Sequence, residues 1–187
     1  MFNFTRFKFN TLHCVTLRGG LMVKKYWVIS DTHFYHKKII EYCKRPDNFN
    51  ELLITSLGKI PEDHVLIHLG DVAWERSEEV PKMIKCKKIL VMGNHDSESA
   101  MKYMSMGWDF ACESFTLDYC TKKVLFSHKP HAWDGTWEVN VHGHLHNSLE
   151  HEKQQKFPEF QKLIACEYLN YKPIDLQRVL MRPAPFY

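Results

Sequence analysis

Short apolar runs alternate with amphipathic segments along most of this chain of 187 residues. Runs rich in β-branched and aromatic residues predict buried strands at 25–30, 64–69, 88–92, 124–127, 139–141 and 163–168. Apolar residues at helical spacing predict helices at 36–42, 50–60, 77–86, 97–106 and 175–181, the last capped by Asp175. Strands alternate with helices in the first half and dominate the second, which predicts an α/β fold with mixed sheets.

No repeat, low-complexity tract or linker interrupts residues 23–187, so we expect a single domain there. Residues 1–22 contain no continuous apolar core of the kind a signal peptide needs. We interpret this stretch as an N-terminal extension, with Met22 as a second candidate for the natural start. The extension holds three basic residues and no acidic one, which leaves 25 − 3 = 22 basic residues against 22 acidic ones in the body. This charge balance predicts no strongly basic surface of the kind that binds nucleic acid.

Two further features of the composition narrow the class of protein. No stretch of about 18 apolar residues is present, so the sequence predicts no membrane-spanning helix. The six cysteines form no CxxC pair, which is typical of reduced thiols in a cytoplasmic protein and disfavours a thiolate zinc site. Twelve histidines are unusually many, and most of them fall in short clusters.

Polar residues with metal-binding side chains follow five of the predicted strands. Because ligands of α/β sheets bind beyond the carboxyl ends of strands, we expect these residues to meet. The candidate metal ligands are Asp31, His33, Asp71, Asn94, His128, His144 and His146. Seven nitrogen and oxygen ligands are too many for one four-coordinate ion, but they suffice for two ions that share a carboxylate. The donor types suit Mn, Fe, Ni or Zn.

These blocks resemble, in type and order, the calcineurin-like metallophosphoesterase superfamily. They read Asp-Thr-His at 31–33, Gly-Asp at 70–71, Gly-Asn-His-Asp at 93–96, His128, and Gly-His-Leu-His at 143–146. Residues 30–40 and 170–176 are similar to small single-domain bacterial and phage members, so the resemblance covers roughly 23–182. It implies a four-layer αββα sandwich of two mixed β-sheets flanked by helices.

The resemblance also implies a role for each residue of the motifs. Asp31, His33 and His146 would hold a first divalent ion, Asn94, His128 and His144 a second, and Asp71 would bridge the two. Manganese is the favoured metal. A hydroxide activated by the two ions would attack phosphorus, with His95 facing the phosphate and acting as general acid. For Asp96 we expect that it either orients His95 or caps the following helix.

The second block departs from the phosphoprotein phosphatases of the superfamily, which carry Asp and Arg after Gly-Asp. Here the block continues Val-Ala-Trp-Glu to Arg76, so we favour a phosphodiester of a nucleotide or another small molecule as substrate. The alternatives are a phosphomonoesterase or protein phosphatase of the same fold, and a catalytically silent metal-binding interaction module. Four further residues are candidates for substrate binding: His36, Arg76, Lys129 and His131.

Overall fold

The computed structural model describes residues 24–147 and 158–181, so the predicted extension at 1–22 lies outside it. The first of its two sheets has the strand order β4-β3-β2-β1-β9. Its strands are β1 (Tyr26–Ile29), β2 (Val65–His68), β3 (Lys87–Val91), β4 (Phe110–Cys112) and β9 (Ile174–Asp175). Strands β1 to β4 run parallel, and β9 pairs antiparallel with β1, so the sheet is mixed.

The second sheet is formed by the later part of the chain in the order β5-β6-β7-β8. Its strands are β5 (Ser114–Tyr119), β6 (Lys122–Ser127), β7 (Val139–His142) and β8 (Gln161–Leu163). The hairpin β5–β6 is antiparallel, whereas β6, β7 and β8 are parallel. Both sheets therefore contain parallel strands whose carboxyl ends can share one edge of the molecule.

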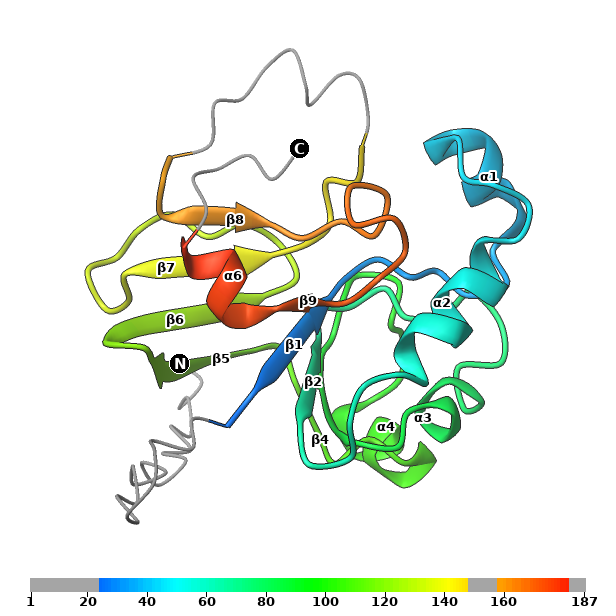
Figure 1. Ribbon diagram of the computed structural model, residues 1–187, viewed down its shortest axis with the longest axis horizontal. Helices are drawn as coiled ribbons and strands as arrows, with labels where there is room; N and C mark the ends of the chain where they lie inside the picture. The colour runs from blue at the N-terminus through cyan, green and yellow to red at the C-terminus, as the bar shows by residue number, and fades with distance from the viewer. Residues whose placement is uncertain (1–23, 148–157, 182–187) are drawn as a thin grey trace.

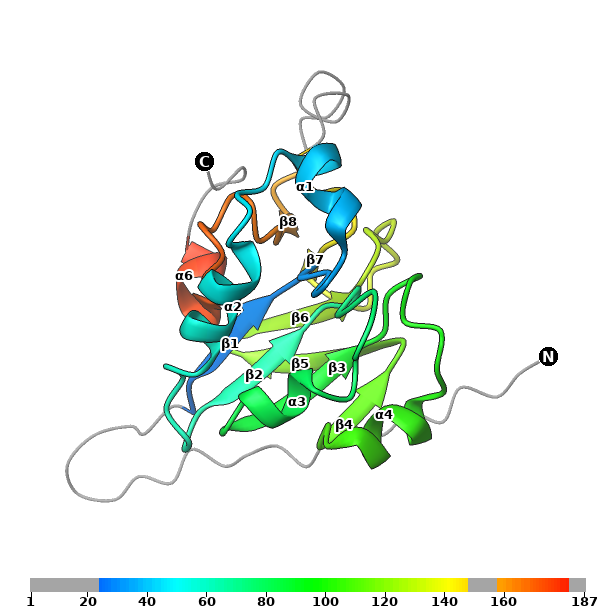
Figure 2. The same cartoon turned by 90° about the vertical axis from the view of Figure 1, so that its right-hand side faces the viewer.

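Four helices lie on one side of the first sheet, and the second sheet lies on its other side (Figures 1 and 2). They are α1 (Lys37–Cys43), α2 (Phe49–Leu57), α3 (Val80–Met83) and α4 (Ala100–Met106). One core cluster joins these helices to the first sheet, and a second cluster fills the space between the sheets. The last helix, α6 (Leu176–Met181), places Leu176 and Val179 in that second cluster.

The two mixed sheets with outer helices confirm the predicted α/β sandwich. The described residues place no helix over the outer face of the second sheet, where Ser114, Thr116 and Asp118 of β5 are exposed. Within the described part of the chain, no helix has both the length and the apolar character needed to cross a bilayer.

Most predicted elements are present, with different bounds. The strand predicted at 163–168 is wrong for most of its length, because β8 ends at Leu163 and the chain then turns. Helix α3 is shorter than predicted: it begins at Val80 with Pro81 in its first turn, and it ends at Met83, after which Ile84 is extended. Helix α4 begins after Ser99, whose side chain accepts a hydrogen bond from the Lys102 N–H. The predicted cap at Asp175 is confirmed, since its carboxylate accepts from the backbone N–H of Gln177 at 2.8 Å.

His68 at the end of β2 is fully buried and is tied to both neighbouring loops. Its Nδ1 accepts from the Gly70 N–H at 3.2 Å. The Thr32 hydroxyl donates its proton to the Val72 carbonyl, so it accepts from His68 Nε2–H at 2.9 Å. Burial lowers the pKa of His68 to about 3, and protonating Nδ1 would also break the bond from Gly70.

This buried imidazole predicts a loss of stability in acid. A folded pKa below the unfolded value of 6.5 gives stability that is complete above pH 6.5 and falls as the pH drops toward 3. From pH 7 to pH 5 the loss should be about 2 kcal/mol. The free energy of unfolding is measured by urea titration in EDTA at each pH for the wild type and for His68→Asn, in which Asn keeps an acceptor for Gly70. The wild-type value minus the variant value should fall by this amount. A difference that does not change with pH would contradict a neutral, buried His68.

Candidate metal centre

All seven predicted metal ligands lie just beyond the carboxyl ends of strands. Asp31 follows β1, Asp71 follows β2 and Asn94 follows β3, all in the first sheet. From the second sheet, His128 follows β6, and the segment with His144 and His146 follows β7. The two sheets meet there directly, since the backbone N–H of His144 donates to the Asp31 carboxylate at 2.9 Å.

The predicted ligands form two groups. Within each group, the donor atoms lie within 4.8 Å of one another. Asp31, His33 and His146 form the first group, with His146 Nε2 3.6 Å from Asp31 Oδ1. The second group is Asp71, His128 and His144, with His128 Nε2 3.2 Å from His144 Nδ1. Asn94 joins the second group, because its Oδ1 lies 3.1 Å from His128 Nε2.

Asp71 lies between the two groups. Its Oδ2 is 3.4 Å from His33 Nε2 in the first group and 3.4 Å from His128 Nε2 in the second. Ligand atoms about 2.1 Å from a shared ion stand roughly 3.0–3.4 Å apart, so this spacing fits donors around cations. Both ring nitrogens of His33 are buried without a hydrogen bond, which leaves a lone pair free for an ion. The donor set and its spacing therefore fit two divalent cations.

Two of the imidazoles are held from behind so that Nε2 faces the centre. His128 donates Nδ1–H to the carbonyl of Leu69 at 2.8 Å. His146 has its Nδ1 3.1 Å from Glu167 Oε1, so this nitrogen carries the proton that the carboxylate accepts. An acceptor on the far nitrogen fixes the tautomer and the orientation of a metal-binding histidine.

Arg45 and Glu167 extend this support, although no motif in the sequence identifies either of them. The Arg45 guanidinium is buried and donates to Glu167, and also to the backbone carbonyls of Thr32 at 2.7 Å and Asp31 at 2.6 Å. One arginine thus connects the loop after β1 to the carboxylate behind His146. Arg45 and Glu167 are 122 residues apart, so no local pattern in the sequence connects them.

The backbone is strained at the centre. Five of the seven predicted ligands have φ between 45° and 74°, the left-handed region that side chains rarely adopt: Asp31, His33, Asp71, His144 and His146. Such conformations cost about 1–3 kcal/mol each and cluster at functional sites.

Two glycines let the loops around the centre approach one another closely. A Cβ on Gly143 would collide with Ser30 and Asp31, and one on Gly93 would collide with Asp71.

The electrostatics of the centre favour a protonated His146 and an ionised Asp71, but neutral rings at His33 and His144. Burial acts to lower the pKa of His146, but hydrogen bonds with Cys43 and Glu167 and the charge of Asp31 raise it to about 11. Burial acts to raise the pKa of Asp71, but the hydrogen bond and charge of His128, the His95 N–H and the charge of His33 together lower it. Burial lowers the pKa of His33 to about 3 and that of His144 to about 4, so both rings are neutral donors at neutral pH.

His95 is exposed beside the centre, with its ring centroid 5.5 Å from that of His33. Its backbone N–H donates to Asp71 Oδ1 at 2.9 Å, which leaves the ring free to face a substrate. The Asp96 carboxylate instead accepts from the backbone N–H groups of Gly93, Asp71 and Val72. It joins the loops after β2 and β3, and Ser99, not Asp96, caps α4.

The four candidate substrate-binding residues lie in different places. His36 is nearly buried, with its ring 5.6 Å from that of His33. Lys129 lies near enough to the centre for its charge to help lower the pKa of His144, after burial and the charge of His128. The Arg76 guanidinium lies over the Tyr35 ring at 5.2 Å. The His131 backbone N–H bonds to Asn140 on β7, so His131 is part of the loop before that strand.

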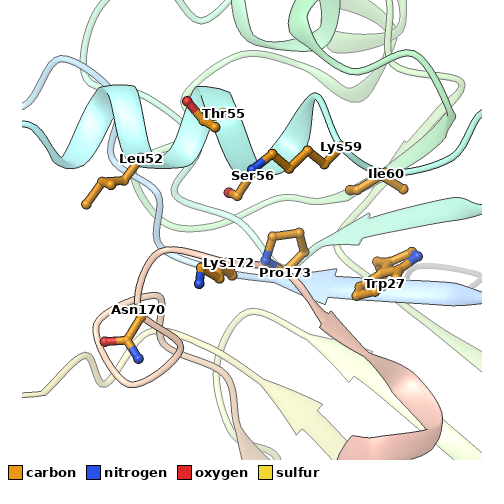
Figure 3. Close-up of a pocket in the computed structure, with 9 residues that line it drawn as sticks. All are labelled: Trp27, Leu52, Thr55, Ser56, Lys59, Ile60, Asn170, Lys172 and Pro173. Atoms are coloured by element: carbon orange, nitrogen blue, oxygen red, sulfur yellow. The ribbon is translucent and has the colours of Figure 1, made fainter.

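A separate pocket of about 360 Å³ lies between α2 and the segment that leads into β9 (Figure 3). None of the predicted site residues lines it. Its walls are formed by Trp27, Leu52, Thr55, Ser56, Lys59, Ile60, Asn170, Lys172 and Pro173. The predicted chemistry therefore belongs to the strand ends and not to this hollow.

Two mixed sheets whose strand ends bring together nitrogen and oxygen donors for two cations are characteristic of metallophosphoesterases. The family model described as calcineurin-like phosphoesterase matches residues 24–176. The chain belongs to this family, as the sequence motifs predicted.

Comparison with individual proteins gives relatives of similar length. The chain is 26% identical over 176 residues to the uncharacterized protein MJ1445 of Methanocaldococcus jannaschii, covering 86% of this chain and 92% of the relative. Among solved structures, the protein of unknown function AQ665 from Aquifex aeolicus superposes with a TM-score of 0.67 at 25% identity, covering 84% of this chain and 98% of the other.

The Glu167 contact predicts an effect on metal binding. Glu167→Gln removes the negative charge behind His146 and leaves Arg45 without its carboxylate. Loss of such support typically weakens metal affinity about 10- to 100-fold, and only the ion held by His146 should be affected. Calorimetric titration of EDTA-stripped protein with Mn²⁺, with metal analysis after dialysis, measures this effect. Glu138→Gln, which changes an exposed carboxylate just before β7, is the matched control. Equal affinities in both variants would show that Glu167 does not support the ligand.

Proposed function

We propose that this protein is a metal-dependent phosphodiesterase for small molecules, nucleotides among them, that uses two divalent ions, with manganese favoured. One observation carries the proposal above the others. Asp71 Oδ2 lies at 3.4 Å from one imidazole nitrogen of each ligand group, as a carboxylate shared by two cations requires. In this assignment Asp31, His33 and His146 hold one ion, and Asn94, His128 and His144 hold the other.

When bound, the ions supply Lewis acidity that lowers the pKa of water and neutralises charge on the phosphate. The protein's own residues keep that chemistry in place. His33 and His144 stay neutral and available as donors, because burial lowers the pKa of each. His95 lies outside the ligand set, where its ring reaches the solvent side of the centre. There it contacts the phosphate and donates a proton to the leaving oxygen.

The size and charge of the substrate follow from the rest of the molecule. The body after residue 21 carries 25 − 3 = 22 basic and 22 acidic residues, so it offers little to follow a long polyanion. Arg76, the nearest counterpart of a phosphatase arginine, lies over the Tyr35 ring. Both features favour a small phosphodiester over a phosphoprotein or a polynucleotide.

A substrate panel tests the proposed activity. Metal-stripped protein is assayed after adding back Mn²⁺, Ni²⁺, Fe²⁺ or Zn²⁺. The substrates are bis-p-nitrophenyl phosphate, p-nitrophenyl phosphate, and 2′,3′- and 3′,5′-cyclic nucleotides. We expect hydrolysis of diesters above monoesters, and none in EDTA. Preference for the monoester would indicate a phosphomonoesterase, and inactivity with every metal at full occupancy would indicate a silent interaction module.

Two substitutions separate metal binding from proton transfer. His95→Ala should lower turnover about 10²- to 10⁴-fold, the usual range for a lost general acid, while metal content stays near two ions per chain. Asp71→Ala should lose metal and activity together. Lys102→Ala, which removes an exposed side chain on α4 to which no role at the centre is assigned, is the control and should keep both. Equal metal loss in the His95 and Asp71 variants would show that His95 is a ligand.

A further inference from the structure

Trp74 is a large aromatic residue beside the metal centre that the mechanism does not use. We propose that its indole is a stacking platform for the nucleobase of a nucleotide substrate whose phosphate binds at the metal centre. This inference rests on the proposed phosphoesterase function and specifies its substrate class. The side chain is 53% exposed, although it lies only three residues after the bridging ligand Asp71.

The position of Trp74 is fixed by the backbone and by one face of its ring. Its backbone N–H donates to the Phe34 carbonyl at 2.9 Å, next to the isolated bridge between Phe34 and Ala73. The indole stacks on the His36 ring, with centroids 4.1 Å apart and planes only 9° from parallel. A ring held in this way loses little conformational freedom when a second ring stacks on it.

The Trp74 indole lies next to the groups that would bind the phosphate. The centroid of Trp74 is 5.6 Å from that of His95, the predicted general acid. Its stacking partner His36 is 5.6 Å from the metal ligand His33. A phosphate at the centre would thus leave the rest of a small substrate next to the exposed part of the indole. Tyr42 is 64% exposed and makes a T-shaped contact with the His36 ring, so it adds a second exposed aromatic surface.

A planar base is the substrate group that this surface fits. Aromatic side chains stack on any base through its π-face, with little dependence on the base. Such a stack is worth about 5- to 100-fold in affinity by alanine substitution. The neutral charge balance disfavours a polynucleotide, so the substrate we infer is a cyclic mononucleotide or a dinucleotide.

The test compares two ligands that share a sugar phosphate and differ in the base, AMP and ribose 5-phosphate. Both are titrated by calorimetry into the full chain loaded with Mn²⁺, because their shared phosphate is expected to bind at the metal centre. Wild type should bind AMP about 5- to 100-fold more tightly than ribose 5-phosphate. Trp74→Ala should abolish this ratio, and Trp74→Phe should keep most of it. AMP should also quench tryptophan fluorescence in wild type, and the quenching should be absent in Trp74→Ala.

Trp133→Ala is the matched control. Trp133 is 63% exposed and donates its indole N–H to the Trp137 carbonyl in the loop before β7, so its loss should leave both the ratio and the quenching unchanged. Equal binding of AMP and ribose 5-phosphate by wild type would overturn the inference, and so would a ratio that survives in Trp74→Ala. Absence of hydrolysis with a Trp74-dependent binding ratio would refute the proposed activity and leave the base platform standing.

Discussion

The structure depends on the compensation of two buried carboxylates. Asp31 and Asp71 are almost completely inaccessible to solvent, and imidazole nitrogens surround them at 3.4–3.6 Å. Burying a charge without a partner is costly, so these carboxylates need positive charge inside the protein. In the absence of an ion, a proton on His146 supplies this positive charge, because its hydrogen bonds and the neighbouring carboxylates raise its pKa. A divalent cation would satisfy the same demand more completely, and the unpartnered His33 ring has a lone pair available for it.

The fold can hold this arrangement because both sheets end at the same place. Parallel strands of each sheet direct the following loops to one edge, and Asp31 accepts the backbone N–H of His144 across the gap. Five of the predicted ligands have left-handed backbone conformations, and such strained conformations persist only where the surrounding structure stabilises them. The Asp96 carboxylate ties two of these loops together through three backbone N–H groups.

Local sequence patterns predict the strands and the ligand blocks that follow them, but not the contacts between distant residues. Each ligand block directly follows an apolar strand, so the meeting of the blocks could be predicted from strand order. Strand β5 was missed because its exposed alternate residues leave only a weak apolar signal. Arg45 directly precedes Pro46, and nothing in this local pattern marks it as the partner of a distant carboxylate. Its contact with Glu167 joins parts of the chain 122 residues apart, and only the tertiary fold creates that contact.

The buried ion pair of Arg45 and Glu167 is better explained by the groups it positions than by any contribution to the free energy of unfolding. A buried ion pair often contributes little net stability, because desolvation offsets most of the attraction between the charges. Two apolar residues of similar volume could therefore fill the same space at little cost to folding. They could not accept the proton on His146 Nδ1 or bind the carbonyls of Asp31 and Thr32. The charges are explained by what they position: the loop that carries the first ligands, and the histidine that completes the group.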